Sequence, residues 1–257
     1  MVSVLPAQRR QRIVEALALA GTVRTEDLAG ALGVSPETVR RDLAILERRA
    51  LLVRVHGGAV AAPSAAGEEP SHLERSTAQA EAKAVIGALA ARLPRPGQTV
   101  VIDVGTTAVH AARALPASFR GVVATCSLLV AAELAGRPGV EVLVSGGRVR
   151  QGDLAVSNAH TLAFFGDLRA DVALLGSGGV DARAGLTDHH LDEVATRRVI
   201  LATTARTYVL ADTTKHGRVA AHRVCGLDGF SGLVADGPPP PALASALVRA
   251  GAEVIAP

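Results

Sequence analysis

The sequence predicts two domains: an N-terminal winged helix-turn-helix and then an α/β domain with a mostly parallel sheet. In residues 9–58, a capped amphipathic helix follows a short turn and precedes a strand that stops at Gly-Gly. Residues 61–72 have two prolines and no apolar periodicity, which is typical of a linker. Beyond them, short apolar runs alternate with helical stretches, as in parallel sheets. We therefore expect a DNA-binding domain over 1–60 and an effector-sensing domain over 73–257.

The central element of the first domain is the helix that begins after Ser35. Ser35 is a good N-cap, and the proline after it suits the first helical position because its missing N–H would be unpaired there. Val39, Leu43 and Leu46 recur at i, i+4 and i+7, which gives the helix one apolar face. Arginines near its N-terminus lie away from that face, which suits the major groove of DNA. The residues predicted to bind DNA are Ser35, Thr38, Arg40, Arg41, Arg54 and His56.

The elements around this helix follow in the order that a winged helix-turn-helix requires. Residues 8–19 form an amphipathic helix, and we expect Thr25 to cap a second one. Gly33-Val34 is the short turn before the Ser35 helix. Residues 51–56 are apolar and β-branched and end at Gly57-Gly58, which predicts the strand and turn of a wing. Its Arg54 and His56 reach the DNA backbone or minor groove.

The alternative for this region is a small helical bundle with solvated arginines; the order of cap, turn, helix and wing favours DNA binding. Residues 1–60 hold nine arginines and six acids, so the whole net charge of +3 lies there. That charge is modest, so specific binding needs two or more copies. We expect a homo-oligomer, a dimer or a tetramer, bound to double-stranded operator DNA.

Composition excludes several other classes of protein. Apolar residues make up 49% of the 257 residues and aromatic ones 2%, so the core must be built from Ala, Val, Leu and Ile. No stretch approaches the roughly 20 apolar residues of a membrane span, and arginine precedes any signal-like run. We expect a soluble, cytoplasmic protein with no membrane partner. Cys126 and Cys225 lack metal-ligand spacing, so we expect no disulfide scaffold, metal or cofactor.

Strands and helices alternate beyond the linker. The predicted strands are Thr99–Val104, Val122–Thr125, Val140–Ser145, Val172–Leu175, Tyr208–Ala211 and Leu233–Ala235. The predicted helices are Ala78–Arg92, Ala108–Leu115, Leu128–Leu134, Asp192–Ala202 and Ala242–Ala250. In parallel sheets, ligands bind beyond the carboxyl ends of the strands.

The loop after the first of these strands, residues 103–107 (Asp-Val-Gly-Thr-Thr), predicts a phosphate site. Glycine permits a tight turn, and the following N–H groups and hydroxyls face outward at a positive helix end. The loop lacks the Gly-Lys-Ser/Thr ending of a Walker loop. The loops at 125–127, 145–147 and 176–179 are, one by one, either ordinary turns or ligand loops. Together, at successive strand ends, they favour a polar ligand with a phosphate.

Lysine usage supports the same site. Of 27 basic residues only Lys83 and Lys215 are lysines, and the two cations are not interchangeable at a tight site. Lys215 follows a strand, where its ammonium could meet a phosphate or sugar oxygen, and Lys83 lies on the helix before the first strand. The alternative is that two exposed lysines persist by chance.

Five motifs occur in a familiar order: Thr38–Leu43 (Thr-Val-Arg-Arg-Asp-Leu), His56–Ala59, Asp103–Thr107, Gly146-Gly147 and Asp212–Lys215. With them the chain resembles DeoR-type bacterial transcriptional regulators over nearly its whole length. The resemblance implies a winged helix and a sensor domain similar in fold to ribose-5-phosphate isomerase. It also implies a phosphorylated sugar or related metabolite as effector, which relieves repression of a catabolic operon.

In this interpretation Asp103 and Ser127 hydrogen-bond sugar hydroxyls, and the lysines and the 103–107 loop hold the phosphate. The predicted effector-binding residues are Lys83, Asp103, Gly105, Thr106, Thr107, Ser127, Gly146, Gly147, Gly176 and Lys215. The chain departs from the family at Cys126, where Thr-Asn-Ser is common, and at Asn158, where a glycine is usual. Cys126 is either a buried small residue or, if exposed, a redox-sensitive thiol.

Two other functions stay open at this point. An isomerase with a helical appendage would need a proton-shuttling carboxylate, and Asp181 is the acid that we would nominate. We expect a regulator and therefore no catalytic residue. A protein-interaction module is the third possibility, and it predicts that no DNA is retained. His189-His190 suggests a metal, but without further ligands at a fixed spacing we favour a solvated loop or a pocket rim.

Overall fold

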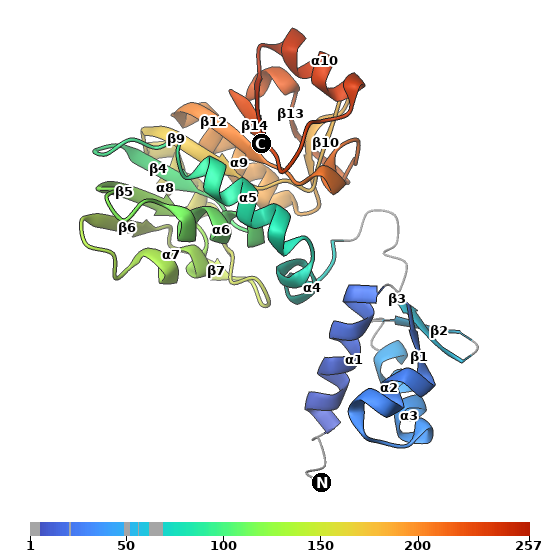
Figure 1. Ribbon diagram of the computed structural model, residues 1–257. Coiled ribbons are helices and arrows are strands. Elements are labelled where there is room, and N and C mark those ends of the chain that lie inside the picture. Colours follow the sequence, from blue (N-terminus) through green and yellow to red (C-terminus); the bar gives the residue numbers. More distant parts are fainter. Residues whose placement is uncertain (1–5, 21, 49–51, 56, 62–68) are drawn as a thin grey trace. The chain divides into compact units, whose positions relative to one another are not determined.

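The computed structural model describes residues 6–20, 22–48, 52–55, 57–61 and 69–257 (Figure 1). Contacts divide the chain into two compact units, Met1–Ala78 and Gln79–Pro257, and each is described by itself. Of the predicted site residues, His56 lies outside the described residues, as does most of the predicted linker. In the part of the chain that is described, no helix is both long and apolar enough to cross a bilayer.

The first unit is a winged helix-turn-helix. Its helices are α1 (Pro6–Ala20), α2 (Thr25–Leu32), α3 (Pro36–Arg48) and α4 (His72–Thr77), and its strands are β1 (Thr22–Arg24), β2 (Leu52–Val55) and β3 (Gly58–Ala61). The strands form an antiparallel sheet in the order β1-β3-β2. Ile13, Val39, Leu43, Leu46 and Leu52 are among the buried residues that join helices and wing in one core. The predicted order of helix, turn, helix and wing is confirmed.

The prediction that Thr25 caps the second helix is wrong. Thr25 is the first residue of α2, and its N-cap is Arg24, whose side chain makes no capping hydrogen bond. The physical reason is β1, which pairs with β3 and runs directly into the helix. The backbone N–H of Thr25 donates to the carbonyl of Gly57 at 2.8 Å, so the wing sheet satisfies one of the first helix amides, which have no partner within the helix.

The second unit is built on a seven-stranded, fully parallel sheet, with the strand order β15-β14-β12-β9-β4-β5-β6. The strands are β4 (Thr99–Ile102), β5 (Gly121–Thr125), β6 (Val140–Val144), β9 (Ala170–Leu175), β12 (Thr204–Leu210), β14 (Gly232–Val234) and β15 (Glu253–Ile255). The chain builds outward from β4, first to one side and then to the other. The order therefore reverses between β4 and β9, where open α/β sheets bind their ligands.

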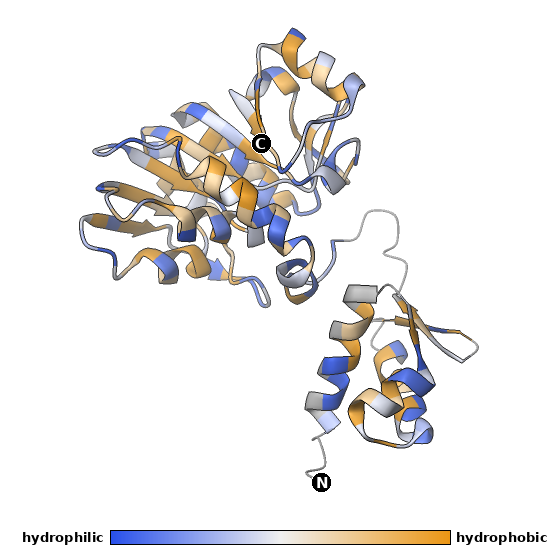
Figure 2. Cartoon of the chain, viewed as in Figure 1, coloured by the Kyte–Doolittle hydropathy of each residue, from blue (hydrophilic) through white to orange (hydrophobic). Residues whose placement is uncertain are grey.

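Helices cover both faces of this sheet. They are α5 (Ala80–Ala90), α6 (Thr106–Ala114), α7 (Leu128–Leu134), α8 (Ala159–Asp167), α9 (Leu191–Thr203) and α10 (Pro241–Ala250). Val100 and Ile102 pack with α5, α6 and α7, whereas Val101, between them, packs on the opposite face with α8 and α9. Because both faces are buried, the strands are largely apolar (Figure 2). The α/β class predicted for this unit is confirmed.

Several short elements of the second unit have no counterpart in the sequence prediction. They are the last strand of the central sheet, β15, the hairpin β7 (Arg148–Val149) and β8 (Val156–Ser157), the antiparallel strands β10 (Gly179–Asp181), β11 (Gly185–Asp188) and β13 (His222–Cys225), and the 3₁₀ turns η1 (Thr213–Lys215) and η2 (Leu227–Gly229). Helix α8 was also not predicted. The β7–β8 hairpin is joined to the loop after β5, because Val156 N–H donates to the carbonyl of Cys126 at 2.7 Å.

Candidate DNA-binding surface and effector site

The N-terminus of α3 presents a polar surface above a buried face. Val39 and Leu43 are almost fully buried, whereas the side chains of Arg40 and Arg41 are 59% and 78% exposed. Ser35 is the N-cap, as predicted, because its hydroxyl accepts from the backbone N–H of Thr38 at 3.2 Å. The Ser35 and Thr38 hydroxyl oxygens lie 3.0 Å apart. Ser35 and the predicted residues of α3 therefore lie in and before its first two turns, with Thr38 half-buried and the charges of Arg40 and Arg41 in solvent.

Two acidic residues that the sequence prediction left out organise this surface. Glu37 lies within ion-pair distance of both arginines, 3.3 Å from Arg40 and 3.7 Å from Arg41. Asp42 points the other way and is 2% exposed; it accepts from Arg9 Nε of α1 at 2.5 Å. This buried pair ties α1 to the recognition helix and fixes the helix in the domain.

Arg54 on the wing is held by α3. Its Nε donates to Glu47 Oε2 at 2.7 Å, and its backbone N–H donates to Glu47 Oε1 at 3.0 Å. Those two hydrogen bonds, the backbone one first, hold the pKa of Glu47 below its usual value. Arg54 is half exposed, so it can turn toward a phosphate only by giving up part of this contact. Val53 and Val55 beside it are exposed.

The loop after β4, where the sequence predicts a phosphate cradle, lies at the point where the strand order reverses. Gly105 precedes α6 with φ 105°, a conformation that a residue with a Cβ rarely adopts, and no side chain caps the helix. Thr106 is buried and Thr107 half-buried in the first turn. The first amides of a helix lack intrahelical partners and carry a partial positive charge. This turn can therefore accept an anion.

Lys83 lies close to the same turn. Helix α5 ends where β4 begins and α6 begins where β4 ends, so both helices run from the carboxyl edge of the sheet to its amino edge. They pack tightly at Gly87, where a Cβ would stand 2.7 Å from the backbone carbon of His110. One turn earlier in each helix, Lys83 and Thr106 come to the same level. Lys83 is 5% exposed. The pKa of His110 is lowered by the burial of its own ring and by the nearby positive charges of Arg113 and Lys83.

Asp103 joins the cradle to a buried ionic cluster. Its Oδ2 accepts from Arg197 Nε at 2.6 Å and from the backbone N–H of Gly176 at 3.0 Å. A side chain at Gly176 would be crowded, because a Cβ there would lie 3.0 Å from the carbonyl oxygen of Val104 and 3.2 Å from Arg197 Nη2. The second carboxylate oxygen, Oδ1, lies 4.0 Å from the thiol of Cys126. One oxygen of the predicted sugar-binding carboxylate is thus already committed.

Arg197 of α9 is the centre of that cluster, with its side chain 2% exposed. It also binds Asp188, and its Nη2 lies 2.9 Å from Glu193 Oε2. Burial raises the pKa of Glu193. For Asp188, burial is outweighed by the charge of Arg197 together with the backbone hydrogen bonds from His189 and His190, so its pKa is lowered. Arg150 of the β7–β8 hairpin binds Glu193 as well.

The cluster is rich in carboxylates. Arg150 is shared between Glu193 and Asp153. Together with Asp103 and Asp188, these make four carboxylates around the two guanidiniums of Arg150 and Arg197. The sequence offered one clue to it. Arg197 lies on the same stripe of α9 as the buried residues Val194 and Ile200, where an apolar residue would be expected.

The other predicted residues lie at the same edge of the sheet. Ser127 is 1% exposed and caps α7, its hydroxyl accepting from Val130 N–H at 3.3 Å. Gly146 and Gly147 are exposed after β6. Ser145 before them is 2% exposed, and its hydroxyl has no hydrogen-bond partner among the described residues. Lys215 is half-buried in η1, which follows β12.

Two alternatives from the sequence have clear structural settings. Asp181 closes the β10–β11 turn by accepting from the backbone N–H groups of Arg183 at 2.8 Å and Ala184 at 2.9 Å. Backbone hydrogen bonds, that of Ala184 first, lower its pKa. Near His189, Asp188 is bound by Arg197, and no group of three potential metal ligands occurs among the described residues. Burial raises the pKa of the Cys126 thiol well above its usual value.

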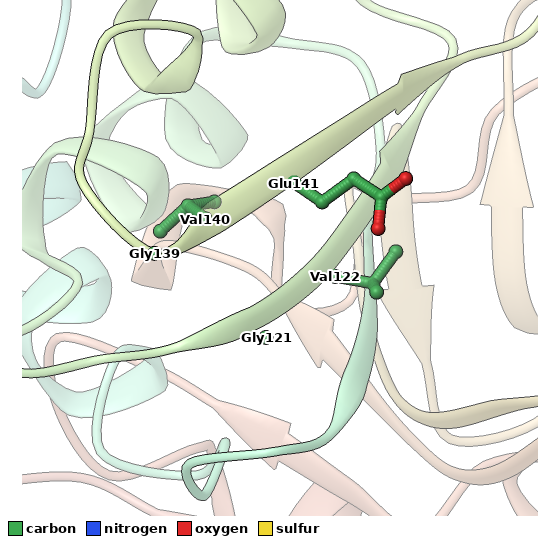
Figure 3. Close-up of a pocket in the computed structure, with 5 residues that line it drawn as sticks. All are labelled: Gly121, Val122, Gly139, Val140 and Glu141. Atoms are coloured by element: carbon green, nitrogen blue, oxygen red, sulfur yellow. The ribbon is translucent and has the colours of Figure 1, made fainter.

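A surface hollow lies at the opposite edge of the sheet. It is lined by Gly121, Val122, Gly139, Val140 and Glu141, where β5 and β6 begin (Figure 3). Apart from Lys83, which lies on α5 before β4, the residues predicted to bind the effector follow the carboxyl ends of the strands. The hollow is therefore not part of the candidate site.

Comparison with known proteins gives matches along both units. A family model described as the DeoR-like helix-turn-helix domain matches residues 9–65, and one described as the DeoR C terminal sensor domain matches residues 78–237. The glycerol-3-phosphate regulon repressor of Escherichia coli (strain K12) is 33% identical over 233 residues, covering 91% of this chain and 92% of that protein. The HTH-type transcriptional repressor CsqR of the same strain is 32% identical over 249 residues, with 97% and 95% covered.

Solved structures give a weaker likeness. Ribose 5-phosphate isomerase A from Methanocaldococcus jannaschii aligns with 54% of this chain and 55% of its own, at 13% identity and a TM-score of 0.40. A likeness at this level carries no inference about activity.

Proposed function

Because this chain belongs to the DeoR family of DNA-binding transcriptional regulators, we propose that it represses a sugar or carbohydrate catabolic operon under the control of a phosphorylated sugar or related metabolite. The uncapped first turn of α6, with Gly105 at φ 105° and buried Lys83 at its level, carries the effector part of this proposal. A relative named as a glycerol-3-phosphate regulon repressor supports a small phosphorylated ligand.

The ligand lies across the reversal point of the sheet in this proposal. Its phosphate meets the amides and hydroxyls of Thr106 and Thr107, and Lys83 supplies a compensating charge. Its hydroxyls reach Asp103 Oδ1 and Ser127. The Ser127 hydroxyl accepts from the α7 amide but keeps a proton to donate, so capping and ligand binding are compatible. Gly146, Gly147, Gly176 and Lys215 border the same space.

On the DNA side, Thr38, Arg40 and Arg41 approach base edges or phosphates, with Arg54 on the flanking backbone. A single module of this size binds DNA weakly, so specific binding requires two or more copies. A dimer or tetramer presents one α3 helix per subunit to an operator with repeated half-sites. Operator DNA, effector and regulator then share the bacterial cytoplasm. Effector binding weakens DNA binding only if the ligand prefers one of two arrangements of the protein.

Asp181, the acid nominated for a competing isomerase function, is unsuited to act as its base. A proton-shuttling carboxylate is tuned toward the working pH, which means an elevated pKa. Asp181 has the opposite shift, and both of its hydrogen bonds serve the turn. We therefore propose that the chain is not an enzyme, and turnover of a pentose or hexose phosphate that Asp181→Asn abolishes would reverse that conclusion.

Fluorescence-anisotropy titration of the full-length protein tests the proposal. The DNA is the region upstream of the operon that encodes it, and binding is measured at one salt concentration with and without a panel of sugar phosphates and glycerol phosphate. We expect specific binding that one phosphate weakens about 5- to 150-fold, the range of ordinary allosteric coupling. Specific binding that no phosphate shifts would contradict the effector assignment alone, and no specific binding would contradict the operator assignment.

A matched pair of variants locates the effector. Thr106→Val removes a hydroxyl from the cradle and should abolish the response while operator binding is unchanged. Thr203→Val makes the same change at the last residue of α9, beside the amino edge of the sheet, and should respond as the wild type does. A normal response in Thr106→Val would contradict the assignment of the phosphate to this turn.

A further inference from the structure

Glu37 and Arg41 stand together at the centre of the exposed face of α3. Val39, Asp42, Leu43 and Leu46 are buried, and successive residues turn by about 100° around a helix, which places Glu37 and Arg41 opposite the buried face and Arg40 on its flank. The Glu37 side chain is 61% exposed. Its Oε2 lies 3.3 Å from Arg40 and its Oε1 3.7 Å from Arg41, so each carboxylate oxygen has one arginine beside it.

If this face of α3 enters the DNA groove, the presence of the acidic residue Glu37 at its centre requires an explanation. The groove is lined by phosphates, which repel a carboxylate, and an exposed ion pair contributes at most about 1 kcal/mol. A carboxylate accepts hydrogen bonds only, and the donors on base edges in the major groove are cytosine N4 and adenine N6. Glu37 is therefore tolerated in the groove only where one of these amino groups meets it.

The arrangement of the pair distinguishes between the two bases. Across a C·G base pair, the cytosine N4 donor lies next to the O6 and N7 acceptors of guanine. A carboxylate with a guanidinium beside it presents the complementary row, an acceptor followed by donors. On adenine the N6 donor lies between two acceptors, N7 of the same base and O4 of the paired thymine, so a carboxylate there has a repelling acceptor on each side, whereas cytosine N4 has one on the guanine side only. A C·G pair matches Glu37 and Arg41, because the guanidinium meets that one acceptor.

We propose that Glu37 and Arg41 read one C·G base pair of the operator as a unit, Glu37 accepting from cytosine N4 and Arg41 donating to guanine. Arg40, on the flank, is then left for the phosphate backbone or a neighbouring base. The inference rests on operator binding by α3 and adds the base pair that sets its specificity.

The test begins with an operator selected from random-sequence duplexes by the full-length protein. Every position of one half-site is then replaced by the three other base pairs, and the affinities of four proteins are compared: the wild type, Glu37→Ala, Glu37→Gln and Glu26→Ala. Glu26 is an exposed acid in the first turn of α2, so its variant makes the same change of charge in a comparable place outside α3. Far-UV circular dichroism checks that each variant is folded.

We expect one position at which the wild type prefers C·G about tenfold or more, the discrimination that a good base contact provides. Glu37→Ala should lose the preference there and nowhere else, and it should bind unrelated DNA more tightly because a negative charge is gone. Glu37→Gln should change the preference toward A·T, because an amide can bond adenine N6 and N7 together. Glu26→Ala should keep the wild-type pattern.

A modified base gives an independent check. Replacing that cytosine by 2-pyrimidinone removes only the N4 amino group, which should weaken the wild type about tenfold and leave Glu37→Ala unaffected. If Glu37→Ala lowers or raises affinity for all sequences alike, or if Glu37→Gln keeps the C·G preference, the acid acts only on the helix or on overall charge and the proposal is wrong. If the wild type selects no sequence at all, operator binding itself fails and this inference fails with it.

Discussion

Replacing Arg197 by methionine would leave three buried carboxylates without the guanidinium between them. Asp103, Asp188 and Glu193 each contact Arg197 directly, and the arginine side chain is 2% exposed. Methionine matches much of its length and packs well on apolar neighbours. The variant therefore removes the charge and the hydrogen bonds with little change of volume.

The expected loss is large because the partners stay behind. Removing one member of a buried ion pair costs about 3–5 kcal/mol, since an uncompensated charge remains in the interior. Arg150 still contacts Glu193, but Asp103 and Asp188 have no other arginine in the cluster. For a unit of this size each kcal/mol lowers Tm by about 2–4 °C, which predicts a fall of about 6–20 °C at neutral pH.

The loss should depend on pH in a stated direction. In the wild type Arg197 lowers the pKa of Asp188, so the stability from this group is present above its unfolded pKa of about 3.9 and is lost as the pH falls through the lower folded value. In the variant the charge that opposes burial most strongly is gone, so the folded pKa values of Asp188 and Glu193 rise. Protonation then relieves the variant as the pH falls, so the difference in Tm should be widest near pH 7 and narrow toward pH 4.

The chain has a convenient probe for this assay. It has no tryptophan and one tyrosine, and that residue is Tyr208 on β12, 3% exposed. Tyrosine fluorescence therefore reports unfolding of the second unit alone. Arg249→Met, at an exposed position on α10, makes the same substitution without burial and should shift Tm by less than about 2 °C. A similarly small shift for Arg197→Met at pH 7 would refute the view that this arginine balances the buried carboxylates.

Three further outcomes follow from the structure. Asp42→Ala removes the buried carboxylate that accepts from Arg9, and it should cost the first unit about 1–3 kcal/mol in urea unfolding followed by circular dichroism, with the Tyr208 transition unchanged. Arg54→Ala breaks an exposed ion pair, so the free energy of unfolding should fall by at most about 1 kcal/mol. DNA binding should weaken for all sequences, and the slope of log affinity against log salt concentration should drop in magnitude by about 1. A loss of affinity confined to one sequence would contradict a contact with the DNA backbone. Burial raises the pKa of Cys126 well above its usual value and that of Cys225 to about 11, so both thiols should react slowly with a disulfide reagent at pH 8 until urea is added.

Elements with a local pattern could be predicted from the sequence. The helix predicted at Leu128–Leu134 has those bounds as α7, and the strand predicted at Val140–Ser145 is β6 less one residue. The strands that were missed have two to four residues, too few to show a period, and they exist because of distant pairing. Val180 of β10, for example, pairs with Leu186 of β11, and Leu186 pairs in turn with Cys225 of β13.

The candidate site could be predicted in position but not in its internal contacts. The glycines and threonines after β4 are recognisable because they follow an apolar strand and precede a helix. The position of Arg197 on an apolar stripe indicates that it is buried, but neither segment indicates that its partner is Asp103, 94 residues away. In the same way, Glu37 reads as a favourable acid in the first turn of a helix, and only its contacts with Arg40 and Arg41 reveal a cluster.

These departures from local pattern lie at the surfaces that the proposals assign to ligands. Along the interior of the sheet, from Val100 to Leu175, burial and apolar character agree, and nothing beyond packing is needed to explain the sequence. At the carboxyl edge, Arg197 occupies an apolar stripe, Lys83 is buried, and the Ser145 hydroxyl finds no hydrogen-bond partner in the part of the chain that the structure describes. At each of these positions a well-packed apolar residue would make the fold more stable. Proteins keep such destabilising residues where function requires them. The lining of the hollow at the amino edge of β5 and β6 includes no buried charged or unsatisfied polar residue. The open hollow is therefore weaker evidence for a ligand site than the closely packed polar residues at the opposite edge.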